Sequence, residues 1–143
     1  MINYSLKTYT SKTKLEGDYF FILSKGNNAG KPLRDACPNC FIMSFKDDRE
    51  CEMFYQLCFV LWKTRRFETW LRGSVIPFIT IGEFHKVLLN TYYSIDNKNR
   101  ISNVFNQARK IEDYQESLIK KIDVIKEYRL ALLSSLINKK VLV

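Results

Sequence analysis

The sequence predicts an α+β fold, with a small mixed sheet and a central buried helix, followed by one long C-terminal coiled-coil-forming helix. Three observations predict it. Short apolar runs between turn-forming residues are typical of strands. An almost wholly apolar segment, residues 53–62, is typical of a buried helix, and a heptad pattern starts at Ile101. We divide the chain into an α/β body, residues 1–95, and a linker with the long helix, residues 96–143.

Four segments of the body have the character of strands or extended chain. Polar and apolar side chains alternate loosely along residues 1–15, and this pattern predicts an edge strand or an extended arm. The apolar runs 19–23 and 40–45 predict buried strands, and a glycine-rich turn at 26–32 follows the first of them. Residues 75–81 are rich in β-branched side chains and predict another strand, which Pro77 restricts to an edge or a bulge.

Two helices are predicted within the body. The first starts with Asp47 or Asp48 as its cap and runs to about Leu71, with acids in its first turns and bases near its far end, as the helix dipole favours. The second runs from Gly82 to Tyr93 and is followed by a polar linker, 94–100. The apolar middle of the first helix predicts a set of core residues, namely Met53, Phe54, Leu57, Leu61 and Trp62.

The long helix carries a coiled-coil pattern. With Ile101 as position a, nine of the twelve a and d residues are apolar, and the others are Gln115, Arg129 and Lys139. At about 1.5 Å per residue the helix is about 58 Å long, too long for one small body to cover. We expect a homodimer or a coiled-coil partner protein, in an orientation that the pattern leaves open, against the alternative of a helix lying back on its own domain. The expected dimerisation residues are Ile101, Val104, Ala108, Ile111, Gln115, Leu118, Ile122, Ile125, Arg129, Leu132 and Leu136.

The composition favours polyanionic partners. The chain has 23 Lys and Arg against 15 Asp and Glu, for a net charge of +8 and a pI near 9.4. Excess positive charge attracts nucleic acid, although it also keeps proteins soluble. No apolar run reaches the ~18 residues of a membrane span, and the first residues lack a signal-peptide pattern. We therefore expect a cytoplasmic protein without a membrane partner.

The residues that usually carry chemistry are sparse. Cys37 and Cys40 have C-x-x-C spacing, but Cys51 and Cys58, seven residues apart on one helix, are separated by about 10 Å and cannot both join them at one zinc ion. Cys37 and Cys40 are the only metal candidates, and structural or turn thiols are the favoured interpretation over a metal or redox role. His85 is the one histidine, and no nucleophile–base motif is present. We expect no enzyme activity, no cofactor and no small-molecule substrate.

Two groups of proteins resemble this chain. The segments FFILSKGNNAGKP (20–32), RGSVIPFI (72–79) and KEYRLALL (126–133) resemble the target recognition domain and the conserved long helix of type I restriction specificity subunits. The strings SKGNNAGKP, CPNC and RGSVIPF also resemble a group of short proteins known only as a domain of unknown function. The first resemblance implies DNA recognition, with paired helices as the spacer between two recognition domains.

Two functional hypotheses follow. The first is a DNA-recognition module, equivalent to half of a specificity subunit, that binds double-stranded DNA and dimerises through its long helix. The alternative is a protein-interaction or accessory module without DNA binding, whose coiled coil docks on another subunit, such as one of a restriction-type complex. For the first hypothesis the candidate phosphate contacts are Lys25, Lys31, Lys63, Arg65, Arg66 and Arg72, and the candidate base contacts are Asn27 and Asn28. A solvated basic face is the alternative for each cation.

Overall fold

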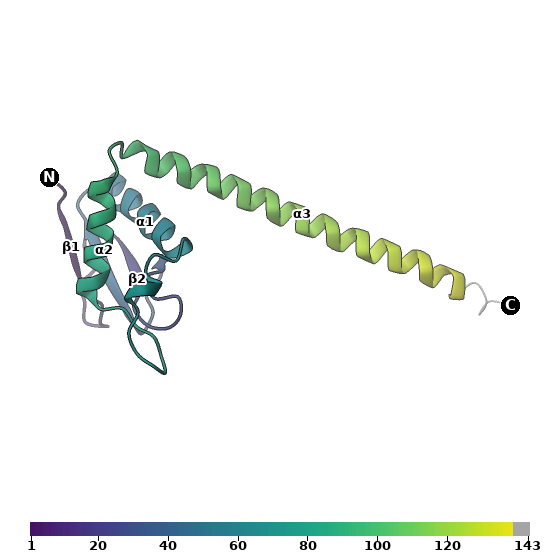
Figure 1. The fold of residues 1–143 in the computed structure, drawn as a ribbon, viewed down its shortest axis with the longest axis horizontal. Coiled ribbons are helices and arrows are strands. Elements are labelled where there is room, and N and C mark those ends of the chain that lie inside the picture. Colours follow the sequence, from purple (N-terminus) through teal and green to yellow (C-terminus); the bar gives the residue numbers. More distant parts are fainter. Residues whose placement is uncertain (139–143) are drawn as a thin grey trace. The chain divides into compact units, whose positions relative to one another are not determined.

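The computed structural model describes residues 1–138 and confirms the α+β class (Figure 1). Residues 139–143, among them Lys139 of the predicted heptads, lie outside the described residues. The elements are β1 (Tyr4–Thr8), β2 (Asp18–Leu23), β3 (Pro32–Leu33), β4 (Cys40–Phe45), α1 (Asp48–Lys63), the short 3-10 helix η1 (Glu68–Trp70), α2 (Ile81–Ser94) and α3 (Asn99–Asn138).

The four strands form one sheet in the order β1-β4-β2-β3. Every pair is antiparallel, so the strand directions are not mixed. For β2 and β3 this follows from their short connection, because parallel neighbours need a crossover of a dozen or more residues. In the centre of the sheet Ile42 of β4 lies opposite both Lys7 of β1 and Phe21 of β2. The predicted edge strand is confirmed as β1.

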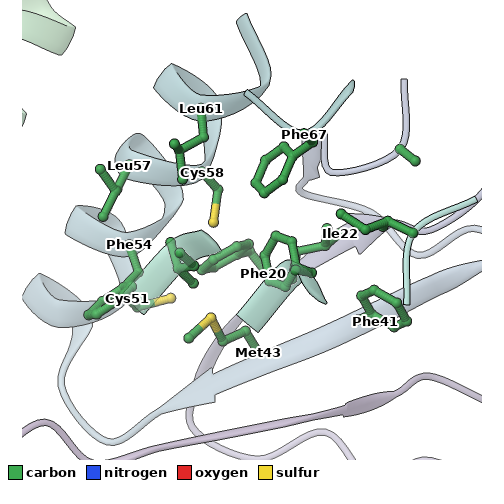
Figure 2. Packing of buried hydrophobic residues seen from close by; sticks show 14 of the residues in the cluster. Phe20, Ile22, Phe41, Met43, Cys51, Phe54, Leu57, Cys58, Leu61 and Phe67 are labelled. Atoms are coloured by element: carbon green, nitrogen blue, oxygen red, sulfur yellow. The ribbon is translucent and has the colours of Figure 1, made fainter. Parts of the chain in front are cut away.

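Apolar side chains cover both faces of the sheet. Alternate residues of β2 and β4, including Phe20 and Met43, enter the main core with α1 and α2. Figure 2 shows them directed toward Phe54 of α1. The intervening residues Phe21 and Ile42 form a second buried cluster on the opposite face. Burial on both faces is the reason that these strands are apolar throughout instead of alternating with polar residues.

Helix α1 packs on the sheet but ends earlier than predicted. It is capped by Asp47, whose carboxylate accepts from the Arg49 amide at 3.0 Å. It ends at Lys63 and does not continue to Leu71. Arg65 adopts a left-handed conformation with φ 61°, which breaks the helical path. The chain then returns Phe67 to the core, where it is 2% exposed.

Residues 75–81 do not form the predicted strand. Arg72 and Phe78 exchange two backbone hydrogen bonds of 2.8 and 2.9 Å, so the segment between them makes a tight loop. Pro77 has no N–H to donate to a ladder, and its carbonyl accepts instead from the Gly26 amide at 2.7 Å. Residues 72–78, which we call the hairpin loop, carry their β-branched side chains outward.

Helix α2 confirms the second predicted body helix, with Thr80 as its cap and with Phe84 and Leu88 buried. At its C-terminal end the Lys98 ammonium donates to the carbonyls of Tyr92 and Ile95. The described chain divides into two compact units, one of residues 1–103 and one that begins at Val104. The first turn of α3 therefore belongs to the first unit and the remainder of the helix to the second.

Candidate interaction surfaces

The clearest candidate surface is an apolar stripe along α3. Seven of the predicted dimerisation residues are large apolar side chains between 41% and 73% exposed. We call them the seam: Val104, Ile111, Leu118, Ile122, Ile125, Leu132 and Leu136. Soluble monomers rarely expose a continuous apolar surface of this extent, and such patches mark interaction sites.

Polar and apolar residues flank the seam. Tyr114, Ile119, Tyr128 and Leu133 occupy the e and g positions beside it and are each more than half exposed. Gln115 and Arg129 stand at a positions within its row. A second set of exposed apolar residues lies outside the seam and its flanks, namely Val124, Leu130 and Ile137.

One predicted dimerisation residue belongs to the body instead. Ile101 is only 5% exposed and packs in the main core. Its neighbour Ser102 donates its hydroxyl to the Gln56 amide oxygen of α1 at 2.7 Å. The a/d pattern continues through this turn of the helix, but tertiary packing takes Ile101 into the core, and the usable seam starts at Val104.

A second candidate surface brings together four of the eight predicted DNA contacts. Asn27 and Asn28 of the glycine turn lie with Lys63 and Arg65 around a hollow of about 360 Å³. Trp62, Phe67 and Glu68 complete most of its lining. The turn and the basic end of α1 are more than thirty residues apart in sequence, and the fold places them at one site. We call this site the basic hollow.

The cations around the basic hollow contact an aromatic ring and an acid. Lys31 and Lys63 hold their ammonium groups 4.9 and 5.4 Å from the centre of the Trp62 ring, within the range of a cation–π interaction. Arg65 contacts Glu68 at 3.4 Å, and both side chains remain more than half exposed. The site therefore presents exposed cations and amides close to an aromatic surface.

The other predicted DNA contacts are placed differently. Arg72 pairs with Glu83 of α2 at 2.5 Å, and this hydrogen-bonded guanidinium lowers the pKa of the Glu83 carboxyl. Lys25 forms a backbone bridge with Phe78 of the hairpin loop, and its side chain is exposed. Arg66 is exposed and does not line the basic hollow.

The four cysteines lie in α1, at the start of β4 and in the turn before it. All four are thiols, and only Cys37 is not buried. Cys40 donates its thiol to the Cys37 carbonyl at 3.1 Å within the C-x-x-C turn. Burial raises the pKa values of the Cys40, Cys51 and Cys58 thiols, so they stay protonated. Within residues 1–138, no group of three or more His, Cys, Asp and Glu side chains is placed to hold a metal ion.

Two features were missed in the sequence. The hairpin loop exposes Val75 and Ile76 at 90% and 62%, and the signal was present in Gly73 and Pro77, two turn formers on either side of them. In addition, the Tyr4 hydroxyl lies 2.6 Å from His85 Nε2. No sequence pattern could have predicted this pair, because 81 residues separate its members.

Comparison with known proteins places the chain in a protein family. Residues 6–135 match a family model described as a family of unknown function, DUF6943. This bears out the resemblance to a domain of unknown function. No curated protein and no solved structure matches the chain, and no finding links it to restriction specificity subunits. In the described part of the chain, none of the helices has the length and apolar character of a membrane span.

Proposed function

The chain belongs to the DUF6943 family, and on this premise we propose that it is a non-enzymatic association module that dimerises through α3. The seam is the observation that carries the proposal. Its seven large apolar side chains recur at a and d positions over 33 residues, and each is at least 41% exposed. A second helix with the same spacing would cover them by knobs-into-holes packing.

The length of the helix supports pairing over a monomeric role. An isolated helix gains little stability in water, and most helical stability in proteins comes from packing of an apolar face. From Val104 onward α3 belongs to its own compact unit, and its apolar residues are exposed. Pairing with a second copy supplies the packing that this unit needs.

The test is the mass of the protein in solution. Light scattering should give a dimer for the natural chain, and Leu118→Asp or Ile122→Asp should give a monomer because each places a carboxylate within the seam. Ser117→Asp is the matched control, since it adds the same charge one residue away at an exposed position outside the seam. Circular dichroism would show that the body remains folded. A monomeric natural chain refutes the proposal.

The basic hollow favours a second candidate function, binding of double-stranded DNA by the body. A DNA backbone is bound by exposed cations and by amides that donate to phosphate oxygens, and Lys63, Arg65, Asn27 and Asn28 gather these groups at one site. Asp48 and Glu50 of α1 lie in its first turn at the opposite end, and Glu52 pairs with Arg34 at 2.9 Å, so these acids do not oppose a phosphate at the basic hollow.

This second function is tested by binding of a labelled random duplex at increasing salt. The logarithm of affinity should fall linearly with the logarithm of salt, and Lys63→Gln or Arg65→Gln should reduce the slope by about 0.9 for each lost phosphate contact. Lys12→Gln removes one exposed charge that lies far from these residues in sequence. It should change the slope less than Lys63→Gln or Arg65→Gln does, because it removes only one unit of the overall charge and no phosphate contact at the basic hollow. Absence of binding at low salt would leave pairing as the only function proposed.

A dimer that also binds DNA would agree with the resemblance to half of a type I specificity subunit. A dimer that does not bind DNA would instead agree with the alternative hypothesis of an accessory module, whose coiled coil docks on another subunit. Adding a random duplex to the light-scattering sample separates these two cases, because only the first takes up DNA and releases it as salt rises.

A further inference from the structure

The charges beside the seam distinguish the two ways in which a pair of α3 helices can run. We infer that α3 pairs antiparallel with a second copy of this chain, with the pair centred at residue 120 of each helix. This inference rests on the proposed function, since it specifies the geometry of the same seam. With Ile101 as position a, antiparallel pairing sets each a residue opposite a d residue of the second copy, whereas parallel pairing sets a opposite a and d opposite d.

Parallel pairing in register brings like charges together. Arg129 is an a residue, so two Arg129 side chains would meet inside the apolar seam without an acid between them. Lys121 at g would face Lys126 at e of the next heptad in the second copy, and the twofold symmetry repeats that contact. Buried and flanking like charges of this kind oppose a coiled coil.

Antiparallel pairing centred at residue 120 gives every seam residue a partner at an a or d position of the second copy. Ile122 then faces Leu118 of the second copy, and each successive a residue meets a d residue at the same distance from the centre. The complete set of pairs is 104 with 136, 108 with 132, 111 with 129, 115 with 125 and 118 with 122. Shifting the helices by one heptad sets Leu132 and Leu136 opposite residues 101 and 97 of the body in one direction, and sets Val104 opposite residue 143, outside the described residues, in the other.

The same arrangement places acids opposite bases. Lys126 faces Glu112 of the second copy across the e positions, and symmetry makes this contact twice. Arg129 faces Ile111 of the second copy, next to that Glu112. Within its own helix Glu112 already contacts Arg109 at 3.1 Å, so the carboxylate is held beside the seam. One unfavourable contact remains, because the two Lys121 side chains meet at the centre.

Reversing the charge at residue 126 gives opposite results for the two orientations. In the antiparallel pair Lys126→Glu sets the new carboxylate against that of Glu112 at both symmetric contacts, and the dimer dissociation constant should rise roughly tenfold. Adding Glu112→Lys to that variant should restore the affinity. In a parallel pair Lys126→Glu would instead replace the repulsion from Lys121 by an attraction and tighten the dimer. Lys120→Glu, at the outermost f position, is the control and should change the affinity by less than about twofold.

A distance measurement gives an independent answer. A spin label at Asn106→Cys, in a Cys37→Ser background because the other three thiols are buried, reports the distance between the two copies. Antiparallel pairing predicts about 42 Å, from about 28 residues at ~1.5 Å each, and parallel pairing predicts about 20–25 Å, the combined width of two helices, because residue 106 is at an outer f position. A short distance with a tighter Lys126→Glu dimer, or a trimer or tetramer in solution, would overturn the antiparallel pair but not association itself. A monomer would overturn the proposed function as well.

Discussion

Gly30 is the position at which the structure makes its sharpest prediction about stability. Its φ is +97°, and a Cβ added there would lie 2.2 Å from Cδ2 of the buried Phe67 ring. Gly26, in the same turn, has φ +93° but nothing within 4 Å of its added Cβ. The two glycines share the unusual backbone conformation and differ in the space around them, so Gly26→Ala is a matched control for Gly30→Ala.

The expected costs can be separated. A non-glycine residue at positive φ costs about 1–2 kcal/mol, which applies to both substitutions. Overpacking against a close-packed ring costs a further ~1–3 kcal/mol, which applies only at Gly30 because Phe67 is 2% exposed and cannot move freely. We expect Gly30→Ala to lower the free energy of unfolding by about 2–5 kcal/mol and Gly26→Ala to lower it by about 1–2 kcal/mol.

The assay is urea unfolding followed by circular dichroism at one chain concentration, since association adds to apparent stability. Phe67→Ala removes Cγ, Cδ2 and Cε2, the ring atoms that a Cβ at residue 30 would approach most closely. The double variant Gly30→Ala/Phe67→Ala should therefore be more stable than the sum of the single losses predicts. Equal losses at Gly26 and Gly30, or strict additivity with Phe67→Ala, would refute the reasoning.

Three further predictions concern ionisable and buried polar groups. Burial raises the pKa of the Cys51 thiol from 9.0 to about 11, so the free energy of unfolding should fall as pH rises from about 9 to 11, and Cys51→Ala should make this fall shallower in urea titrations. The Arg72 guanidinium lowers the pKa of the Glu83 carboxyl below 4.5, so the stability from this pair should be lost as pH falls through the lowered pKa, and Glu83→Gln should weaken that dependence in acid titrations. Ser102→Ala leaves the buried Gln56 amide oxygen without its donor and should cost about 1–2 kcal/mol in urea unfolding.

Each of these has a contradicting result. An alkaline fall that is unchanged in Cys51→Ala would assign it to other groups. A Glu83→Gln variant with the natural acid profile would show that the ion pair with Arg72 does not contribute. A Ser102→Ala variant as stable as the natural chain would show that the Gln56 oxygen finds another donor.

The local elements of the fold were largely predictable from sequence. The apolar runs at 19–23 and 40–45 predicted β2 and β4, because strands buried on both faces are apolar throughout. The acidic start at Asp47 predicted the cap of α1, since a side-chain oxygen there accepts from a free amide. These features depend on residues close together in sequence, and the structure confirms them.

The predictions that were wrong concern segments in which a long-range contact overrides the local conformational preference. Residues 75–81 have strand composition, but the Pro77 carbonyl bonds to Gly26 and the segment closes as the hairpin loop. The sequence predicts a first helix that runs to about Leu71 with bases near its far end, whereas the left-handed Arg65 and the burial of Phe67 end it at Lys63. Neither result follows from propensity, because each depends on a partner distant in the chain.

The sequence by itself determined the long helix and its seam, because heptad spacing needs only a residue's neighbours one and two turns away. The charges that favour an antiparallel pair are likewise read from positions in that helix. Only the tertiary structure decided that Ile101 belongs to the body and that Gly30 lies against Phe67. It alone gathered Asn27 and Arg65 around one hollow. Those outcomes depend on close packing between segments far apart in sequence, which no local pattern records.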